Sequence, residues 1–141
     1  MADNDDLRAQ NLAFYQAFEA KDLDAMANVW GEESPVSCVH PGWDPIVGRD
    51  AVLESWEAIF LGTRAISFTL RNAHLVVAGD AAWIILVEEI DAAHEDGERV
   101  RAATLATNMF LRESTGWRLV HHHAGPAVSV PTARPSERTL N

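Results

Sequence analysis

Among the residues that could carry chemistry, His40 is the leading candidate for catalysis. It follows a short apolar run and precedes Pro41-Gly42, so we expect it at the end of a strand, beside a loop. Histidine titrates near neutral pH, and at the mouth of a pocket it could remove a proton next to a carbonyl group as a general base. The alternative is a histidine that only hydrogen-bonds the backbone and orders the loop of residues 41–45.

A second pair of polar residues lies in the C-terminal half of the chain. Asn108 has apolar neighbours, and a buried amide needs partners for its donor and acceptor groups. The strand pairing described below sets His121 opposite Asn108. The two could polarise a carbonyl or enolate oxygen of a substrate, or they could form a satisfied polar pair of the core. We therefore predict a catalytic set of His40, Asn108 and His121, with these structural alternatives open.

Three consecutive histidines near the C-terminus raise the question of a metal site. Successive residues of a strand point to opposite faces, so His122 is expected to point away from His121 and His123 and to pack at a subunit interface. His121 and His123 could converge with His40 or Glu89 on a zinc-like ion. Nothing in the sequence fixes the third ligand. We therefore predict neither a metal nor another cofactor, and we place His123 in a ligand pocket.

The aromatic residues predict an apolar pocket. Trp43 lies in the Pro- and Gly-rich loop beside His40 and could cover a bound ligand. Trp56 and Trp83 follow helical and strand spacing, which places them by default in the core, where they could also form the walls of a pocket. The predicted contacts to a small apolar ligand are Trp43, Trp56, Trp83, Phe110 and Phe14.

The periodicity of the apolar residues predicts the elements that position these groups. Helical spacing indicates three helices, over residues 7–20, 23–30 and 49–62. After Gly62 the period changes to two, and turn signals such as Gly79-Asp80 divide the following segment into four antiparallel strands. Three helices followed by an antiparallel meander predict an α+β fold with the helices packed on one face of the sheet.

Tight turns between these strands fix a register. With a two-residue turn at Asp96-Gly97, Trp83 faces Phe110, and the next turn sets Asn108 opposite His121. The interior face then carries Trp83, Ile85, Asn108, Phe110, His121 and His123. The opposite face is also apolar, and the helices can cover only one of the two. We therefore predict a homodimer through the open face of the sheet.

Charge and cysteine content limit the setting and the partners. The formal net charge is −10, without a cluster of basic residues, which argues against binding to nucleic acid or to an anionic membrane. The acidic run from Glu88 to Glu98 is most simply a solvated hairpin end, in which only Glu89 shares the parity of the pocket side. The single cysteine, Cys38, excludes an internal disulfide and favours a reducing, cytoplasmic setting.

Several motifs carry a resemblance to a known superfamily. They are Phe18-Glu-Ala-Lys-Asp-Leu-Asp-Ala-Met, Val39-His-Pro-Gly-Trp, Gly48-Arg-Asp-Ala-Val, Asn108-Met-Phe and Gly116-Trp-Arg-Leu-Val-His-His-His. In this order they resemble the SnoaL-like branch of the nuclear transport factor 2-like superfamily. The segment from Phe68 to Ala127 is also similar to the association domain of calcium/calmodulin-dependent kinase II.

This resemblance implies a cone-shaped α+β barrel, commonly dimeric, with a pocket between the helices and the concave face of a curved sheet. It sets His40 near the catalytic base of ketosteroid isomerases and Asn108 near their oxyanion-binding acid. Phe14 stands where those enzymes carry a tyrosine, which separates this chain from their mechanism. The superfamily hosts many activities on one fold, so the resemblance implies a fold more strongly than a reaction.

The length of 141 residues fits one compact domain. We predict a single SnoaL-like domain over residues 1–130 and a flexible tail over residues 131–141. No apolar run approaches the roughly 20 residues that span a bilayer. The predicted function is that of a small-molecule pocket protein, a cofactor-independent isomerase, cyclase or dehydratase acting on an apolar carbonyl or cyclic substrate. The alternative is a non-catalytic ligand-sensing or dimerisation domain.

Overall fold

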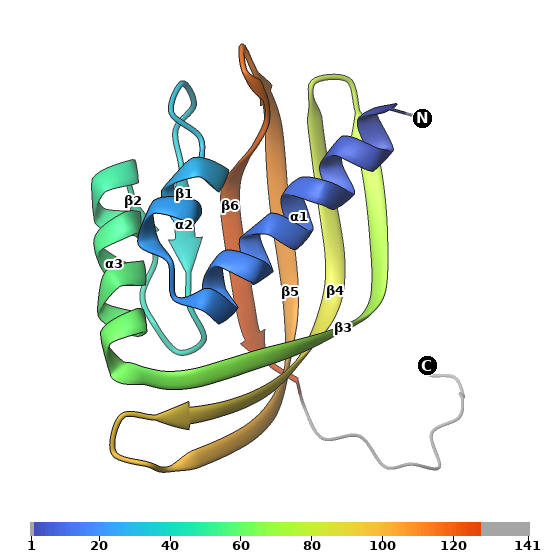
Figure 1. The fold of residues 1–141 in the computed structure, drawn as a ribbon. Helices are drawn as coiled ribbons and strands as arrows, with labels where there is room; N and C mark the ends of the chain where they lie inside the picture. Colours follow the sequence, from blue (N-terminus) through green and yellow to red (C-terminus); the bar gives the residue numbers. More distant parts are fainter. Residues whose placement is uncertain (1, 128–141) are drawn as a thin grey trace.

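The computed structural model describes residues 2–127, and over this range the chain forms three helices and one six-stranded sheet (Figure 1). The helices are α1 (Ala2–Ala20), α2 (Leu23–Val29) and α3 (Arg49–Gly62). The strands are β1 (Ser37–Val39), β2 (Ile46–Val47), β3 (Thr63–Ala78), β4 (Ala81–His94), β5 (Arg99–Glu113) and β6 (Gly116–Pro126). The predicted α+β class is confirmed. The predicted tail over residues 131–141 lies outside the described residues.

The sheet is curved and open, with the strand order β2-β1-β6-β5-β4-β3. Neighbouring strands are antiparallel, except for β1 and β6, which run parallel. Helix α1 crosses the concave face, and the long strands β3, β4 and β5 curve beyond its C-terminal end (Figure 1). Because β2 and β3 form the two edges, the sheet makes a cone that is not closed into a barrel.

The apolar period of the first segment accounts for α1, which places Leu7 and Phe14 at 0% exposure against the sheet. The helix begins at Ala2, earlier than predicted. Its acidic residues Asp3 and Asp5 therefore lie in the first turn, where negative charge interacts favourably with the helix dipole. None of the helices in the described part of the chain is long and apolar enough to cross a membrane.

A three-residue loop sets the register between β4 and β5. The His94 amide donates to the Glu98 carbonyl oxygen at 2.8 Å, which closes a loop of three residues between them. Gly97 in this loop has a φ of 94°, a conformation that glycine adopts without steric cost. The predicted two-residue turn at Asp96-Gly97 is therefore wrong by one residue.

Because side chains alternate between the two faces, this difference of one residue moves every side chain of β4 to the face opposite the predicted one. Asn108 pairs with Ile84, and the predicted pairing with Ile85 is wrong. Trp83 pairs with Met109 on the outer face, so its predicted place in the interior is also wrong.

A β-bulge at Val120 changes the register within β6. On the hairpin side of the bulge the predicted register holds, but on the other side Asn108 pairs with His122 rather than with His121. His122 is consequently buried on the inner face, at 2% exposure. Its predicted position at a subunit interface is wrong, and His121 and His123 take the outer positions.

The two faces of the sheet differ in how they are covered. The inner face packs against the helices and forms one continuous core. On the outer face Ile85, Leu105 and Met109 are 47%, 56% and 37% exposed. Within residues 2–127 one apolar sheet face is thus left uncovered, as predicted, although the residues that β4 contributes to it differ from the predicted ones.

Candidate functional site

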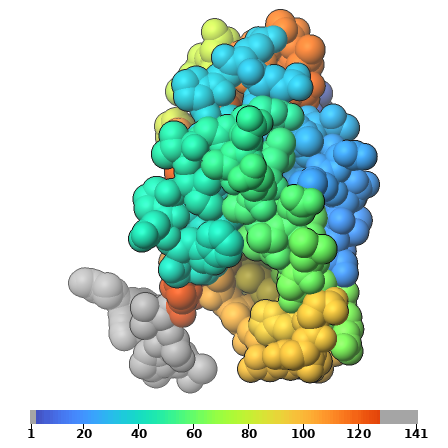
Figure 2. Space-filling view, turned by 90° about the vertical axis from the view of Figure 1, so that its left-hand side faces the viewer, coloured from blue at the N-terminus to red at the C-terminus, as the bar shows by residue number. Residues whose placement is uncertain are grey.

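A cavity of about 500 Å³ lies between the concave face of the sheet and the C-terminal ends of α1 and α3. Figure 2 shows the surface hollowed between α3 and the hairpin of β4 and β5. Apolar side chains from the surrounding elements form most of its walls, among them Phe18, Ile59, Ile66, Phe68, Ile90 and Val100. The volume and the apolar walls suit a small organic molecule.

Glu88 supplies a buried carboxyl group to this cavity. It lies on β4, lines the cavity and is 3% exposed. The hydroxyl groups of Tyr15 and Thr104 each donate to one of its oxygens, both at 2.5 Å. Burial raises the pKa of Glu88, and the two hydroxyl hydrogen bonds oppose this increase. A carboxyl group with a raised pKa is suited to act as a general acid or a hydrogen-bond donor.

His40 follows β1 and lines the same cavity. Its Nε2 lies 2.9 Å from the Ser55 hydroxyl oxygen, whose own proton goes to the Val52 carbonyl oxygen at 2.6 Å. His40 therefore donates from Nε2, and its Nδ1 is the nitrogen without a proton. Trp43 and Trp56 pack edge-on against the imidazole ring. Burial lowers the pKa of His40 to about 4, so the ring is neutral near pH 7.

His122 is the second histidine of the cavity. Its Nδ1 lies 2.6 Å from the side-chain oxygen of Asn108, and the Phe14 ring packs on it with 4.9 Å between ring centroids. The pKa of His122 is lowered to about 3, mainly by burial and to a smaller extent by the charges of neighbouring histidines. The cavity thus combines one buried carboxyl group with the buried, neutral imidazoles of His40 and His122, and a third histidine, the exposed His94, also lines it.

The predicted catalytic set is only partly brought together. His40 lines the cavity as predicted. Asn108 is fully buried behind the cavity wall, where its recorded hydrogen bonds all go to other side chains of the core. His121 lies on the outer face, with its Nδ1 2.7 Å from the Ser37 hydroxyl oxygen. The bulge in β6 explains why its predicted position opposite Asn108 is wrong.

The predicted ligand contacts divide in a similar way. Trp43 stands at the rim of the cavity, 45% exposed and packed against His40. Trp56 and Phe14 are fully buried behind the histidine rings and do not line the cavity. Phe110 is also buried in the core, away from the lining.

Trp83 and His123 were expected in the pocket and lie instead on the outer face of the sheet. Trp83 is displaced by the three-residue loop between β4 and β5, and His123 by the bulge in β6. Both predicted positions are therefore wrong for the same kind of reason, a register that differs by one residue.

The sequence prediction missed Glu88 and His122. The expectation that Glu89 faces the pocket is wrong, since Glu89 is exposed and pairs with Arg71 at 2.5 Å. A signal for Glu88 was present, because it continues a period of two formed by apolar residues: Ile84, Leu86 and Ile90. For His122 no comparable signal exists, since its position depends on the bulge.

Metal and thiol chemistry find little support in this site. Within residues 2–127 no group of three or more His, Cys, Asp or Glu side chains is arranged to hold a metal ion. The Cys38 sulfur lies 3.7 Å from His40 Nε2, but burial raises the pKa of the Cys38 thiol to about 12. A thiolate nucleophile is therefore disfavoured at neutral pH.

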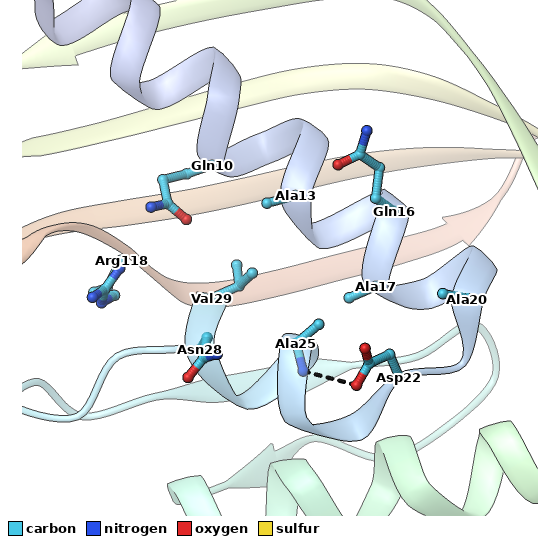
Figure 3. A pocket seen from close by; sticks show the side chains of 10 residues that line it. All are labelled: Gln10, Ala13, Gln16, Ala17, Ala20, Asp22, Ala25, Asn28, Val29 and Arg118. Atoms are coloured by element: carbon cyan, nitrogen blue, oxygen red, sulfur yellow. Dashed lines mark hydrogen bonds between the residues drawn. The ribbon is translucent and has the colours of Figure 1, made fainter.

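A second hollow lies between α1 and α2 (Figure 3). Alanine side chains form its floor, and polar side chains such as Gln10, Gln16 and Asn28 surround it. The groove is also lined by the carboxylate of Asp22, which is exposed and accepts a hydrogen bond from the Ala25 backbone amide at 3.1 Å, and so caps α2. Because none of the described residues around this groove is a buried titratable side chain, the apolar cavity is the candidate functional site.

The fold is an α+β cone of the cystatin-like type, with an apolar cavity under a concave sheet, and a 34% identical neighbour of the same fold belongs to the NTF2-like family. The SnoaL-like domain model matches residues 7–129. The chain belongs to the SnoaL-like domain family. The predicted family resemblance is thereby confirmed.

Similar proteins carry several different names. A proposed dehydratase of the NTF2-like family from Streptomyces avermitilis is 34% identical, covers 91% of this chain and 98% of its own, and superposes with a TM-score of 0.84. A proposed calcium/calmodulin-dependent protein kinase type II association domain from Thiobacillus denitrificans is 36% identical, with coverage of 86% and 94% and a TM-score of 0.75.

A plant protein extends this range of names. F-box protein SKIP8 of Arabidopsis thaliana is 26% identical over 114 residues, which make up 81% of this chain and 46% of SKIP8. This chain therefore spans less than half the length of that relative. The variety of names agrees with a fold that serves several functions.

Proposed function

We propose that this protein binds a small, uncharged, apolar carbonyl compound and transforms it by acid–base chemistry without a cofactor, as an isomerase, cyclase or dehydratase. The observation that carries the proposal is the buried carboxyl group of Glu88, which shares an apolar cavity with two neutral histidines. None of the described residues that line the cavity is a lysine or an arginine, so an anionic substrate would be buried without a counter-charge. The similarity to a proposed dehydratase supports the class of reaction.

The two kinds of group divide the chemistry between them. A neutral imidazole, from His40 or His122, accepts the proton from the carbon next to the carbonyl group. Burial raises the pKa of Glu88, and in its protonated form this carboxyl group donates a hydrogen bond to the carbonyl oxygen, where negative charge develops. Glu88 takes the polarising role predicted for Asn108 and His121, since neither of these lines the cavity.

Hydrogen exchange in two cyclic ketones, 2-tetralone and cyclohexanone, tests this proposal. We expect the protein to accelerate the incorporation of deuterium next to the carbonyl group in D₂O, measured by NMR. Glu88→Gln and His122→Gln should each slow the exchange by about 100-fold or more, because each removes a proton-transferring group. Glu89→Gln is the matched control, since Glu89 is the next carboxylate on the strand and points outward. Absence of acceleration for both ketones contradicts the enzymatic proposal.

The alternative function is a non-catalytic ligand-sensing or dimerisation domain. The similarity to a proposed kinase association domain favours it, together with the way Asn108 and His40 use their polar atoms within the chain. Saturable binding of 2-tetralone, followed through the part of the tryptophan fluorescence change that Trp43→Phe removes, without any hydrogen exchange would favour a sensor. Binding and exchange together would favour the enzyme.

We also propose that two copies of the chain associate through the outer face of the sheet. The exposed Ile85, Leu105 and Met109 support this, because their contiguous apolar surface would otherwise face water. Leu105→Glu should convert a dimer to a monomer in analytical ultracentrifugation at micromolar concentration. Leu61→Glu, at a 74% exposed leucine on α3, is the matched control and should leave the dimer intact. A monomeric wild-type protein under these conditions contradicts this proposal.

The remaining proposals concern setting and partners. The buried, single Cys38 supports a reducing, cytoplasmic setting, which subcellular fractionation would test. The net charge of −10 supports the absence of nucleic-acid and membrane-surface partners. Binding to a DNA duplex or to anionic vesicles at physiological salt would contradict it.

A further inference from the structure

We infer that Asn108 is a positioning residue for His122: its amide group holds the imidazole with the proton on Nδ1 and so presents the bare Nε2 to the cavity. The catalytic meaning of this inference rests on the proposed function. The tautomer itself is a property of the protein alone and can be observed without any substrate.

The Asn108 amide nitrogen carries two protons, and both have acceptors in the core. One goes to the side-chain oxygen of Asn11 at 2.8 Å, and the other goes to the Tyr15 hydroxyl oxygen at 3.1 Å. Both protons are thus used within the core. The Asn108 side-chain oxygen can only accept, and the atom 2.6 Å away from it is His122 Nδ1. Nδ1 must therefore carry a proton.

The hydrogen bond between Tyr15 and Glu88 determines the orientation of the Asn108 amide. Tyr15 has one hydroxyl proton, and it goes to Glu88 at 2.5 Å, so Tyr15 can only accept from Asn108. Turning the amide over would bring the oxygens of Asn108 and Asn11 together. The reverse arrangement would need Glu88 to donate its proton to Tyr15 rather than to a ligand in the cavity, and both asparagine amides to turn. It would end with the His122 proton on Nε2.

The surroundings of His122 make the choice of tautomer matter. Phe14 and Trp56 pack against the ring, and the titratable groups His40, His121 and His123 all oppose a second proton on it. The ring is therefore neutral near pH 7 and has only one nitrogen able to accept a proton. No hydrogen bond to Nε2 is recorded among the described residues, and His122 lines the cavity, which leaves this nitrogen for a ligand.

The same amide thus connects the two proposed reactive groups. Its nitrogen holds the Tyr15 hydroxyl, which in turn bonds Glu88, and its oxygen holds His122. Asn108 does not line the cavity and does not touch a ligand there. It acts through His122, and this explains why a fully buried amide lies next to a functional cavity without opening into it.

Two-bond ¹H–¹⁵N correlation NMR of the full-length, ¹⁵N-labelled wild-type protein at neutral pH tests the inference directly. The His122 signals are assigned by comparison with His122→Gln. We expect a proton on Nδ1 and none on Nε2. A His122 with its proton on Nε2, or an equal mixture of the two tautomers, would overturn the inference.

A pair of matched variants sharpens the test. Asn108→Asp keeps an acceptor beside Nδ1 and adds a negative charge there, so it should keep the tautomer and raise the pKa of His122 by about 1 to 3 pH units. Asn11→Asp adds the same group to the same network, but not against the ring, and should leave the tautomer unchanged. A folded Asn108→Asp protein in which His122 titrates as in the wild type would overturn the inference. If Asn108→Asp does not fold, the wild-type spectrum still decides.

The outcomes separate this inference from the proposed function. The Nδ1 tautomer without ketone exchange would leave the positioning role of Asn108 intact and remove the enzymatic proposal. Ketone exchange together with a His122 proton on Nε2 would support the enzymatic proposal and overturn the positioning role of Asn108.

Discussion

The inner and outer faces of the central strands are both apolar, but their polar residues differ in burial and in hydrogen bonding. On the inner face Glu88, Asn108 and His122 are nearly inaccessible to solvent, and one chain of hydrogen bonds through the Tyr15 hydroxyl connects all three. On the outer face Glu89 bonds Arg71, His121 bonds Ser37, and both residues lie nearer to water. Neighbouring residues of the same type therefore differ in chemistry. Burial lowers the pKa of both His121 and His122, but His122 is almost completely buried and its pKa falls to about 3.

The pair Asn108→Leu and Thr107→Val should give the largest contrast between the faces. Asn108→Leu leaves Asn11, Tyr15 and His122 without their partner in the core, and we expect it to lower the free energy of unfolding by about 3 to 5 kcal/mol. Thr107→Val changes the adjacent, outward residue and should cost within about 0.5 kcal/mol. Urea denaturation measures both. Equal losses would contradict the contrast.

Acidification should destabilise the protein through its inner histidines. The pKa values of His40 and His122 in the folded state, about 4 and about 3, lie below the value of about 6.5 in the unfolded chain. Their contribution is present above pH 6.5 and is lost as the pH falls toward those folded-state values. From pH 7 to pH 5 each histidine should cost about 2 kcal/mol.

Two variants assign this loss to one face. His122→Gln should reduce the slope of stability against pH, whereas His121→Gln, one residue away on the outer face, should change it less. Glu88 acts in the opposite direction, because burial raises its pKa and protonation then favours the folded state. Denaturation curves at several pH values measure these slopes. A slope unaffected by His122→Gln would contradict the assignment.

The smallest effect is expected from the ion pair on the outer face. Arg71 and Glu89 are each about half exposed, so water and salt screen their interaction. Glu89→Gln should lower the free energy of unfolding by about 0.5 kcal/mol or less, and added salt should reduce the difference further. A loss above about 2 kcal/mol, measured by urea denaturation, would show that this face is more sensitive to its polar groups than we infer.

The elements could be predicted from the sequence because their signals are local. The helical stripe ending at Gly62 and the turn at Gly79-Asp80 depend on residue types within a few positions, and both lie where they were expected. The registers depend on the length of one loop and on one bulge. Since both faces of the strands are apolar, the hydrophobic pattern does not distinguish a register from its neighbour.

The candidate site shows the same division. His40 and Trp43 were predicted because a loop after a strand places them whatever the register of the later strands. Glu88 and His122 were missed because the registers of β4 and β6 each differ by one residue from the predicted ones. Where two adjacent residues are both acidic or both histidines, a difference of one residue exchanges the one that faces inward for the one that faces outward.

The bulge at Val120 also has a consequence for comparison between relatives. It adds one residue to β6 without adding a residue to the partner strand. In a relative whose strand has no bulge here, the residue that faces the cavity is the one that a gap-free alignment pairs with His121, although the residue of this chain that faces the cavity is His122. The correspondence between homologous side chains in this strand therefore requires a one-residue gap beside Leu119, even where the total lengths of the two chains agree.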